Sequence, residues 1–143
     1  AQEEVGNRGA FGAGFSVTPE IALVLDGADT ADAPGVPAHK RGCTLGKGVV
    51  LPVMDKGSIA DRGLFEELRA LAERENILWQ TSGSIPGRTD AAALQRTKAG
   101  VRTAMLSVPV RYHHTPSGLV SMEGVDGMLA LTRAFLSDLA EKE

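Results

Sequence analysis

Residues 20–26 read Glu20-Ile21-Ala22-Leu23-Val24-Leu25-Asp26, an apolar run whose side chains do not alternate with polar ones. A strand with one solvated face would alternate, so this run predicts a strand that is buried on both faces. A second run, Arg102–Val108, also reads as a buried strand. Strands of this kind occur in parallel sheets that are covered by helices on both sides. The two runs therefore predict an α/β fold.

Helix and strand patterns alternate along the rest of the chain. Residues 1–5 could end a strand, and further strands are predicted at 48–55, where Pro52 breaks the run, and at 77–81. Helices are predicted at four places: 8–16, from the Asp61 cap to about Glu75, from Thr89 or Asp90 to near Gly100, and after Ser121 with Val125, Leu129, Thr132, Leu136 and Leu139 on one face. Residues 27–47 and 82–87 predict loops. Because helices rather than two-residue hairpin turns separate the strands, we expect three αβα layers around a mainly parallel sheet.

Composition limits the class of protein. The chain has 143 residues, of which 43% are hydrophobic and 23% charged, as in an ordinary globular domain. Its formal net charge of −3 provides no basic field for nucleic acid or anionic lipid, and no run is long enough to span a bilayer. We therefore expect neither nucleic-acid nor membrane partners. The single cysteine, Cys43, excludes an internal disulfide and favours a reducing, cytoplasmic location, where it would serve as a structural thiol.

Acidic and histidine residues fall where the predicted strands end. Glu3 and Glu4 end the first strand, Asp26 ends the second, and His113 and His114 follow Arg102–Val108. Ligands of open α/β sheets bind off the carboxyl ends of strands, so these side chains are expected at one rim. Carboxylates and imidazoles suit zinc, cobalt or manganese, and two ions about 3.5–4 Å apart can activate a shared water. An Asp that caps a turn and a solvated loop His remain open alternatives.

Several stretches, taken together and in order, resemble a known enzyme family. They are Gln2-Glu3-Glu4-Val5-Gly6-Asn7-Arg8-Gly9-Ala10, the run into Asp26, Asp32-Ala33-Pro34-Gly35, Leu45-Gly46-Lys47-Gly48, Thr89-Asp90-Ala91, and Ser107-Val108-Pro109-Val110-Arg111-Tyr112-His113-His114-Thr115-Pro116. The set is similar to the dinuclear metallo-aminopeptidases that form tetrahedral shells, a group of glutamyl, leucyl and deblocking aminopeptidases often mislabelled cellulase or endoglucanase. The Leu45–Gly48 stretch lacks the spacing of a phosphate-binding P-loop.

The resemblance implies roles for particular residues. Glu3 would be the general base, Glu4 and His114 would bind one metal ion, and Asp26 would bind the other. The intact enzyme would use two divalent ions, zinc or cobalt, to remove N-terminal residues from short peptides, and it would form a homo-oligomer. Thr89 and Asp90 would line the floor of the site, although a helix-capping role explains them equally well. Arg111 and Tyr112 would shape the loop that leads to the metal histidine.

The resemblance also implies that part of the enzyme lies upstream. The family pattern has an earlier His, a bridging Asp and an inserted lid or dimerisation domain before the Glu pair. We therefore expect residues 1–143 to be the C-terminal portion of a metallopeptidase catalytic domain that binds metal weakly, or not at all, by itself. Arg88 and His113 depart from the family pattern. Two other functions stay open: a non-catalytic interaction module that retains the fold, and a deacylase that uses the same site.

Overall fold

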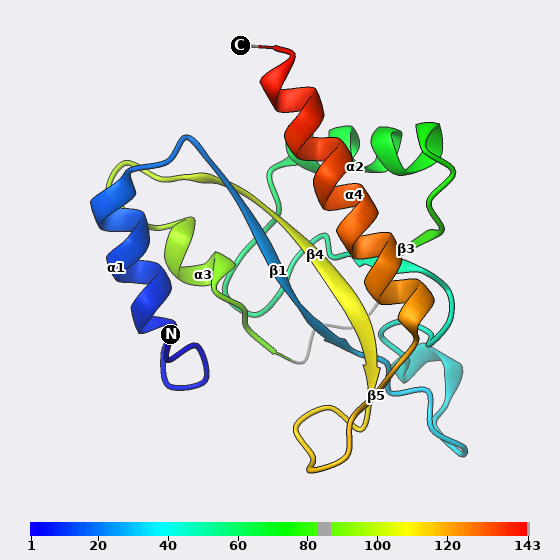
Figure 1. Ribbon diagram of the computed structural model, residues 1–143. Helices are drawn as coiled ribbons and strands as arrows, with labels where there is room; N and C mark the ends of the chain where they lie inside the picture. The colour runs from blue at the N-terminus through cyan, green and yellow to red at the C-terminus, as the bar shows by residue number, and fades with distance from the viewer. Residues whose placement is uncertain (83–86, 143) are drawn as a thin grey trace.

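The computed structural model describes residues 1–82 and 87–142, which form a sheet flanked by helices (Figure 1). The strands are β1 (Ile21–Asp29), β2 (Val49–Leu51), β3 (Trp79–Thr81), β4 (Arg102–Arg111) and β5 (Leu119–Val120). The helices are α1 (Arg8–Val17), α2 (Arg62–Arg74), α3 (Ala91–Leu94) and α4 (Met122–Ala140), with a short 3₁₀ turn, η1, at Ala38–Lys40. The described helices include none with the length and apolar character that a membrane span requires.

The sheet has the order β1-β4-β2-β3, and β5 pairs with the end of β4. β1 and β4 run parallel, from Ile21 opposite Arg102 to Asp29 opposite Val110, and β2 runs parallel to β3. The two parallel pairs meet through an antiparallel contact between Val50 and Ser107, a reversal that the sequence did not indicate. The prediction of a mainly parallel sheet is confirmed.

Helices cover both faces of the sheet, which confirms the three layers (Figure 1). β4 divides its side chains between the faces, because successive residues of a strand point to opposite sides. One face packs against α2 and α4 in a cluster of Val49, Leu51, Leu64, Leu68, Leu71, Ala72, Ala104, Leu106, Leu131 and Phe135. On the other face Met105 packs with Val24 and with Ala91 of α3. This smaller cluster lies below the candidate site.

Helix α2 agrees with its prediction because its signals are local. Asp61 accepts a hydrogen bond from the backbone N–H of Leu64 at 3.0 Å and so caps the helix, as predicted. The predicted apolar stripe, Leu64, Leu68, Leu71 and Ala72, is buried.

Only part of the face predicted for α4 packs against the core: Leu139, near the end of the helix, does so. The buried residues of α4 are Gly124, Leu131 and Phe135, whereas Leu129 and Leu136 are 49% and 58% exposed. The helix carries two apolar stripes, and periodicity alone does not show which of them meets the sheet.

Three predicted boundaries also differ from the structure. Residues 1–5 form a turn rather than a strand end, because the N–H groups of Gly6 and Asn7 both donate to the carbonyl of Glu3. β1 continues to Asp29, so Asp26 lies inside the strand. α3 ends at Leu94 rather than near Gly100, and tighter turns follow it. Of the predicted loop 82–87, residues 83–86 lie outside the described residues.

Candidate functional site

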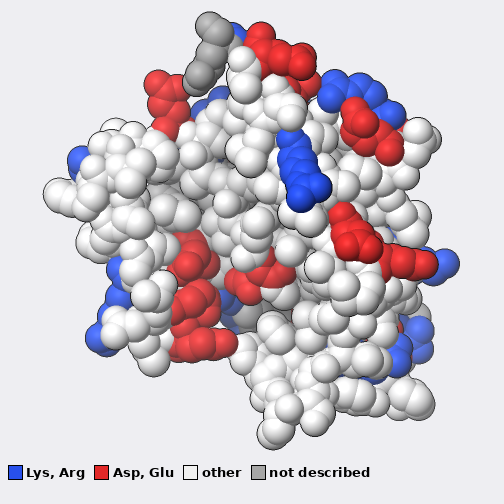
Figure 2. Space-filling view, viewed as in Figure 1, with Lys and Arg blue, Asp and Glu red and all other residues white. Residues whose placement is uncertain are grey.

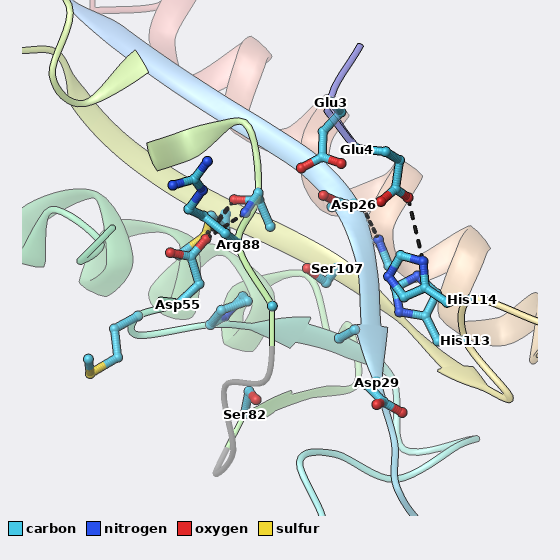
Figure 3. A pocket seen from close by; sticks show the side chains of 17 residues that line it. Glu3, Glu4, Asp26, Asp29, Asp55, Ser82, Arg88, Ser107, His113 and His114 are labelled. Atoms are coloured by element: carbon cyan, nitrogen blue, oxygen red, sulfur yellow. Dashed lines mark hydrogen bonds and ion pairs between the residues drawn. The ribbon is translucent and has the colours of Figure 1, made fainter. Parts of the chain in front are cut away.

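A pocket of about 280 Å³ opens beside the N-terminal turn, between the ends of β1 and β4 and the start of α3. Figure 2 shows several acidic side chains close together on the face of the molecule that carries this turn. Distant parts of the chain supply the ionisable residues that line the pocket: Glu3, Glu4, Asp26, Asp29, Asp55, Arg88, His113 and His114 (Figure 3). The four site residues predicted from the sequence, Glu3, Glu4, Asp26 and His114, are all among them.

Glu4 and His114 meet at the mouth of the pocket. Glu4 Oε1 lies 3.5 Å from His114 Nδ1, and both side chains are exposed (Figure 3). An exposed contact of this kind adds little to the stability of the fold. The loop that carries His114 turns sharply, because Tyr112 and His114 both have positive φ angles, 59° and 57°. The fold therefore brings a carboxylate and an imidazole together without a large stabilising gain.

His113 supports this arrangement from below. Its ring lies 4.2 Å from the ring of His114, and it packs over the backbone of Gly27. A Cβ atom at Gly27 would lie only 3.1 Å from His113 Nε2, so a larger residue would displace the imidazole. The glycine that follows Asp26 thus leaves the room that the His113 ring uses.

Glu3 occupies a partly buried position in the N-terminal turn. Its Oε1 accepts a hydrogen bond from Asn7 Nδ2 at 2.8 Å. Burial raises the pKa of the Glu3 carboxyl, and the nearby charges of Asp26, Glu4 and Asp90 raise it further, against the opposing effect of the Asn7 hydrogen bond. A carboxyl whose pKa lies above its usual value is better suited to exchange protons near neutral pH.

Asp26 faces the pocket from within β1, opposite Ser107 of β4. Its Oδ1 accepts the backbone N–H of Gly27 at 2.7 Å. Although Asp26 is not at the strand end as predicted, it still reaches the pocket because the N-terminal turn and the His113–His114 loop close over that part of β1 (Figure 3).

Asp55 and Thr89 form the floor of the pocket, and the sequence did not identify the role of Asp55. The buried Asp55 carboxylate accepts hydrogen bonds from the N–H groups of Gly57, Ser58 and Thr89 and from the Thr89 hydroxyl, at 2.6–2.9 Å. These bonds hold the pKa of Asp55 below its usual value, although burial alone would raise it. Thr89 also accepts the N–H of Ala91 at 3.3 Å, so it both lines the floor and caps α3. The sequence feature that could have identified Asp55 is its position two residues before Gly57, because an Asp at this spacing from a glycine is typical of a turn in which the carboxylate accepts backbone N–H groups.

The residues present fit a divalent metal in part. Glu4 and His114 offer one carboxylate and one imidazole in contact, which is a suitable donor pair for zinc-type ions. Across residues 1–82 and 87–142, however, no three His, Cys, Asp or Glu side chains come together as a metal site. Catalytic zinc usually has three protein ligands, so these residues could supply part of such a ligand set but not all of it.

Comparisons with known proteins agree with the fold and with the ordered motifs. The M42 glutamyl aminopeptidase family matches residues 1–131. The chain is 37% identical to the lysyl aminopeptidase of Pyrococcus furiosus over 139 residues, which are 96% of this chain and 39% of that protein.

Solved structures of aminopeptidases are also similar to this chain. Aminopeptidase APDkam598 from the archaeon Desulfurococcus kamchatkensis superposes with a TM-score of 0.91 at 32% identity, over 94% of this chain and 39% of that one. The TET1 peptidase of Pyrococcus horikoshii, which can assemble into a tetrahedron or a large octahedral shell, gives 0.79 at 29% identity, over 94% and 38%. The chain thus spans about two fifths of the length of the curated relatives it matches.

Proposed function

The chain belongs to the M42 glutamyl aminopeptidase family, and we propose that it forms the part of a metal-dependent aminopeptidase that carries the general base and three metal ligands. One observation supports this most directly. Glu4, near the start of the chain, and His114, near its end, lie 3.5 Å apart at the mouth of a pocket that Glu3 and Asp26 also line.

Glu4 and His114 would hold one divalent ion, and Asp26 would hold a second. Zinc or cobalt suits these oxygen and nitrogen donors. When bound, such ions lower the pKa of a water molecule and polarise the carbonyl of the scissile peptide bond. The remaining ligands would come from outside the described residues, since these provide no set of three.

Glu3 would be the general base. It lies beside Glu4 in the turn, but its side chain is held by Asn7 instead of by a histidine. It would take a proton from the attacking water at one carboxylate oxygen and pass it to the leaving amine. The raised pKa of Glu3 favours this exchange at neutral pH.

We also propose that residues 1–143 are a partial catalytic domain of a longer polypeptide. Two surfaces support this. β1 lies at the end of the described sheet with its outer edge unpaired, and long edge strands are normally covered. On α1, Phe11, Phe15 and Val17 are exposed. Further strands and helices packed there would cover both surfaces.

The substrates proposed for the complete polypeptide are short peptides with free amino termini. The assembly proposed for it is a homo-oligomer, by analogy with the TET1 peptidase of Pyrococcus horikoshii. A cytoplasmic site of action agrees with the buried, unpaired Cys43 thiol.

The test uses the complete polypeptide that the gene encodes, loaded with zinc or cobalt. Glu3→Gln should abolish release of N-terminal residues while metal content stays at the wild-type level, because Glu3 binds no ion in this proposal. The control is Glu20→Gln, the same substitution at an exposed carboxylate outside the pocket. If Glu3→Gln instead lost its metal and regained its rate when metal was resupplied, the roles of Glu3 and Glu4 would be reversed.

Two other functions predict different results in the same assay. A deacylase would cleave N-acylated peptides in preference to free ones. A non-catalytic module, which the incomplete ligand set of the described residues favours, would leave both kinds of peptide intact with metal present.

A further inference from the structure

Asn7 occupies the N-cap position of α1 but does not cap the helix. An Asn at this position normally accepts a helix N–H with its side-chain oxygen. Here no such hydrogen bond forms, and the backbone of Asn7 adopts the left-handed conformation, with φ 56° and ψ 34°. Asn7 is only 3% exposed. Because the buried Asn7 amide does not cap its own helix, its hydrogen bonds must be formed with other groups.

Both hydrogens of the Asn7 amide nitrogen point at carboxylates. Nδ2 donates to Glu3 Oε1 at 2.8 Å and to Asp90 Oδ1 at 3.1 Å. Ionised carboxylates only accept hydrogen bonds, so the amide must present its nitrogen to them rather than its oxygen. Asp90 therefore fixes which way the Asn7 amide faces, and the amide in turn fixes one oxygen of Glu3.

The backbone strengthens this link. The N–H groups of Gly6 and Asn7 donate to the carbonyl oxygen of Glu3 at 3.1 and 3.0 Å. Asn7 thus holds Glu3 through both its main chain and its side chain. Because Asp90 immediately precedes α3, the Glu3 carboxylate is tied to the starts of two helices.

We propose that Asn7 is a positioning residue for Glu3, with Asp90 as its anchor. Asn7 donates a hydrogen bond to Oε1 of Glu3. In the described part of the structure Oε2 of Glu3 accepts no hydrogen bond, so it remains available to the attacking water. This inference rests on the proposed role of Glu3 as base. A base held in place before the substrate arrives avoids the loss of rate that follows a displacement of about 1 Å, which can reach roughly 100-fold.

The central experiment replaces Asn7 by Gly in the complete, metal-loaded polypeptide. Gly accepts the positive φ without strain, so Asn7→Gly removes the amide and keeps the backbone. We expect kcat to fall about 10- to 100-fold while KM changes less than about threefold, because positioning acts on the transition state. The matched control is Asn76→Gly, at an exposed Asn with nearly the same φ of 54° at the end of α2, and it should leave kcat unchanged.

Substitutions at Asp90 test the anchor. Asp90→Asn keeps a carbonyl oxygen that can accept from Asn7, whereas Asp90→Ala removes the acceptor. We expect Asp90→Asn to retain more of kcat than Asp90→Ala. A purely structural role would instead lower the unfolding midpoint of both variants in parallel with their activity.

Glu3→Gln, measured alongside, separates this inference from the proposed function. If Glu3→Gln left turnover unchanged, the assignment of Glu3 as base would fail. If Glu3→Gln abolished turnover but Asn7→Gly kept the wild-type kcat, or lost activity only together with metal or folded structure, the positioning role alone would fail.

Discussion

Arg111 binds Asp32 through two hydrogen bonds, from Nε to Oδ1 at 2.8 Å and from Nη2 to Oδ2 at 3.0 Å. The Asp32 side chain is 6% exposed and that of Arg111 is 30% exposed. Thr30 and the N–H of Leu45 donate to the same carboxylate at 2.8 and 3.3 Å. The pair thus joins the long loop after β1 to the end of β4, directly before the turn that carries His114.

Asp32→Asn should destabilise the fold. It keeps the shape of the side chain but leaves the guanidinium of Arg111 without a charged partner. Breaking a fully buried pair costs about 3–5 kcal/mol, and since Arg111 is partly solvated we expect about 2 kcal/mol. Urea unfolding measures the change. Glu66→Gln, which breaks an exposed pair with Arg69, is the control and should have little effect.

The same pair predicts how stability depends on pH. Arg111 holds the pKa of the Asp32 carboxyl well below its usual range. A carboxyl with a depressed folded-state pKa stabilises the fold above its unfolded pKa of about 3.9, and this contribution is lost as the pH falls toward the folded value. The difference in unfolding free energy between wild type and Asp32→Asn should therefore shrink below about pH 4. A difference that stayed constant to pH 2 would contradict this assignment.

Cys43 should be unreactive in the folded chain. It is 5% exposed, and burial together with the charges of Asp29 and Asp32 raises the pKa of its thiol to about 12. The thiolate is the reactive form, so alkylation at pH 8 should require unfolding. The folded state keeps its proton where the unfolded thiol loses it, so Cys43 should also lower stability as the pH rises above about 8.5. Rapid labelling of the native chain at pH 8 would contradict the buried placement.

The sequence predicted those elements whose signals are local. The Asp61 cap and the leucine stripe define α2 within a few residues, and the two apolar runs define β1 and β4. The antiparallel contact between Val50 and Ser107 depends on residues far apart in the chain, so no local pattern reports it. For the same reason the sequence did not show which stripe of α4 is buried.

The residues of the candidate site likewise include some that the sequence predicted and some that it did not. Glu3, Glu4, Asp26 and His114 were selected from the sequence because of their chemistry and the order of the motifs around them, and they line one pocket. Asn7 lies in the same motif as Glu3 and Glu4, but the sequence indicated no role for it, because its proposed role depends on a contact with Asp90, which is distant in the chain. Asp55 was missed because only two of its four donors, the N–H groups of Gly57 and Ser58, are local. The other two belong to Thr89, which is distant in the chain and meets Asp55 only in the folded structure.

Gly48 and Gly46 form a matched pair for a test of backbone strain. Both have positive φ angles, 84° and 75°, so an alanine at either position is strained. A Cβ atom at Gly48 would lie 1.9 Å from the carbonyl oxygen of Leu78, whereas at Gly46 nothing lies within 4 Å. We expect Gly46→Ala to cost about 1 kcal/mol and Gly48→Ala at least about 3 kcal/mol, by chemical denaturation. Equal losses would mean that β2 and the residue before β3 are not in close contact.

Metal binding should depend on residues of the complete polypeptide that lie outside the part described by the structure. In the proposed arrangement Glu4 and His114 would give one ion two donors and Asp26 would give the other ion one, so the 143-residue chain alone should lose its ions on dialysis. The complete polypeptide should keep two ions, because its further residues would bring each ion to three protein ligands: one more beside Glu4 and His114, and two more beside Asp26. Elemental analysis after dialysis measures both, and His114→Ala should remove one ion from the complete polypeptide. Two tightly held ions in the isolated chain would show that its own residues complete the site, and the proposed division of ligands would then be wrong.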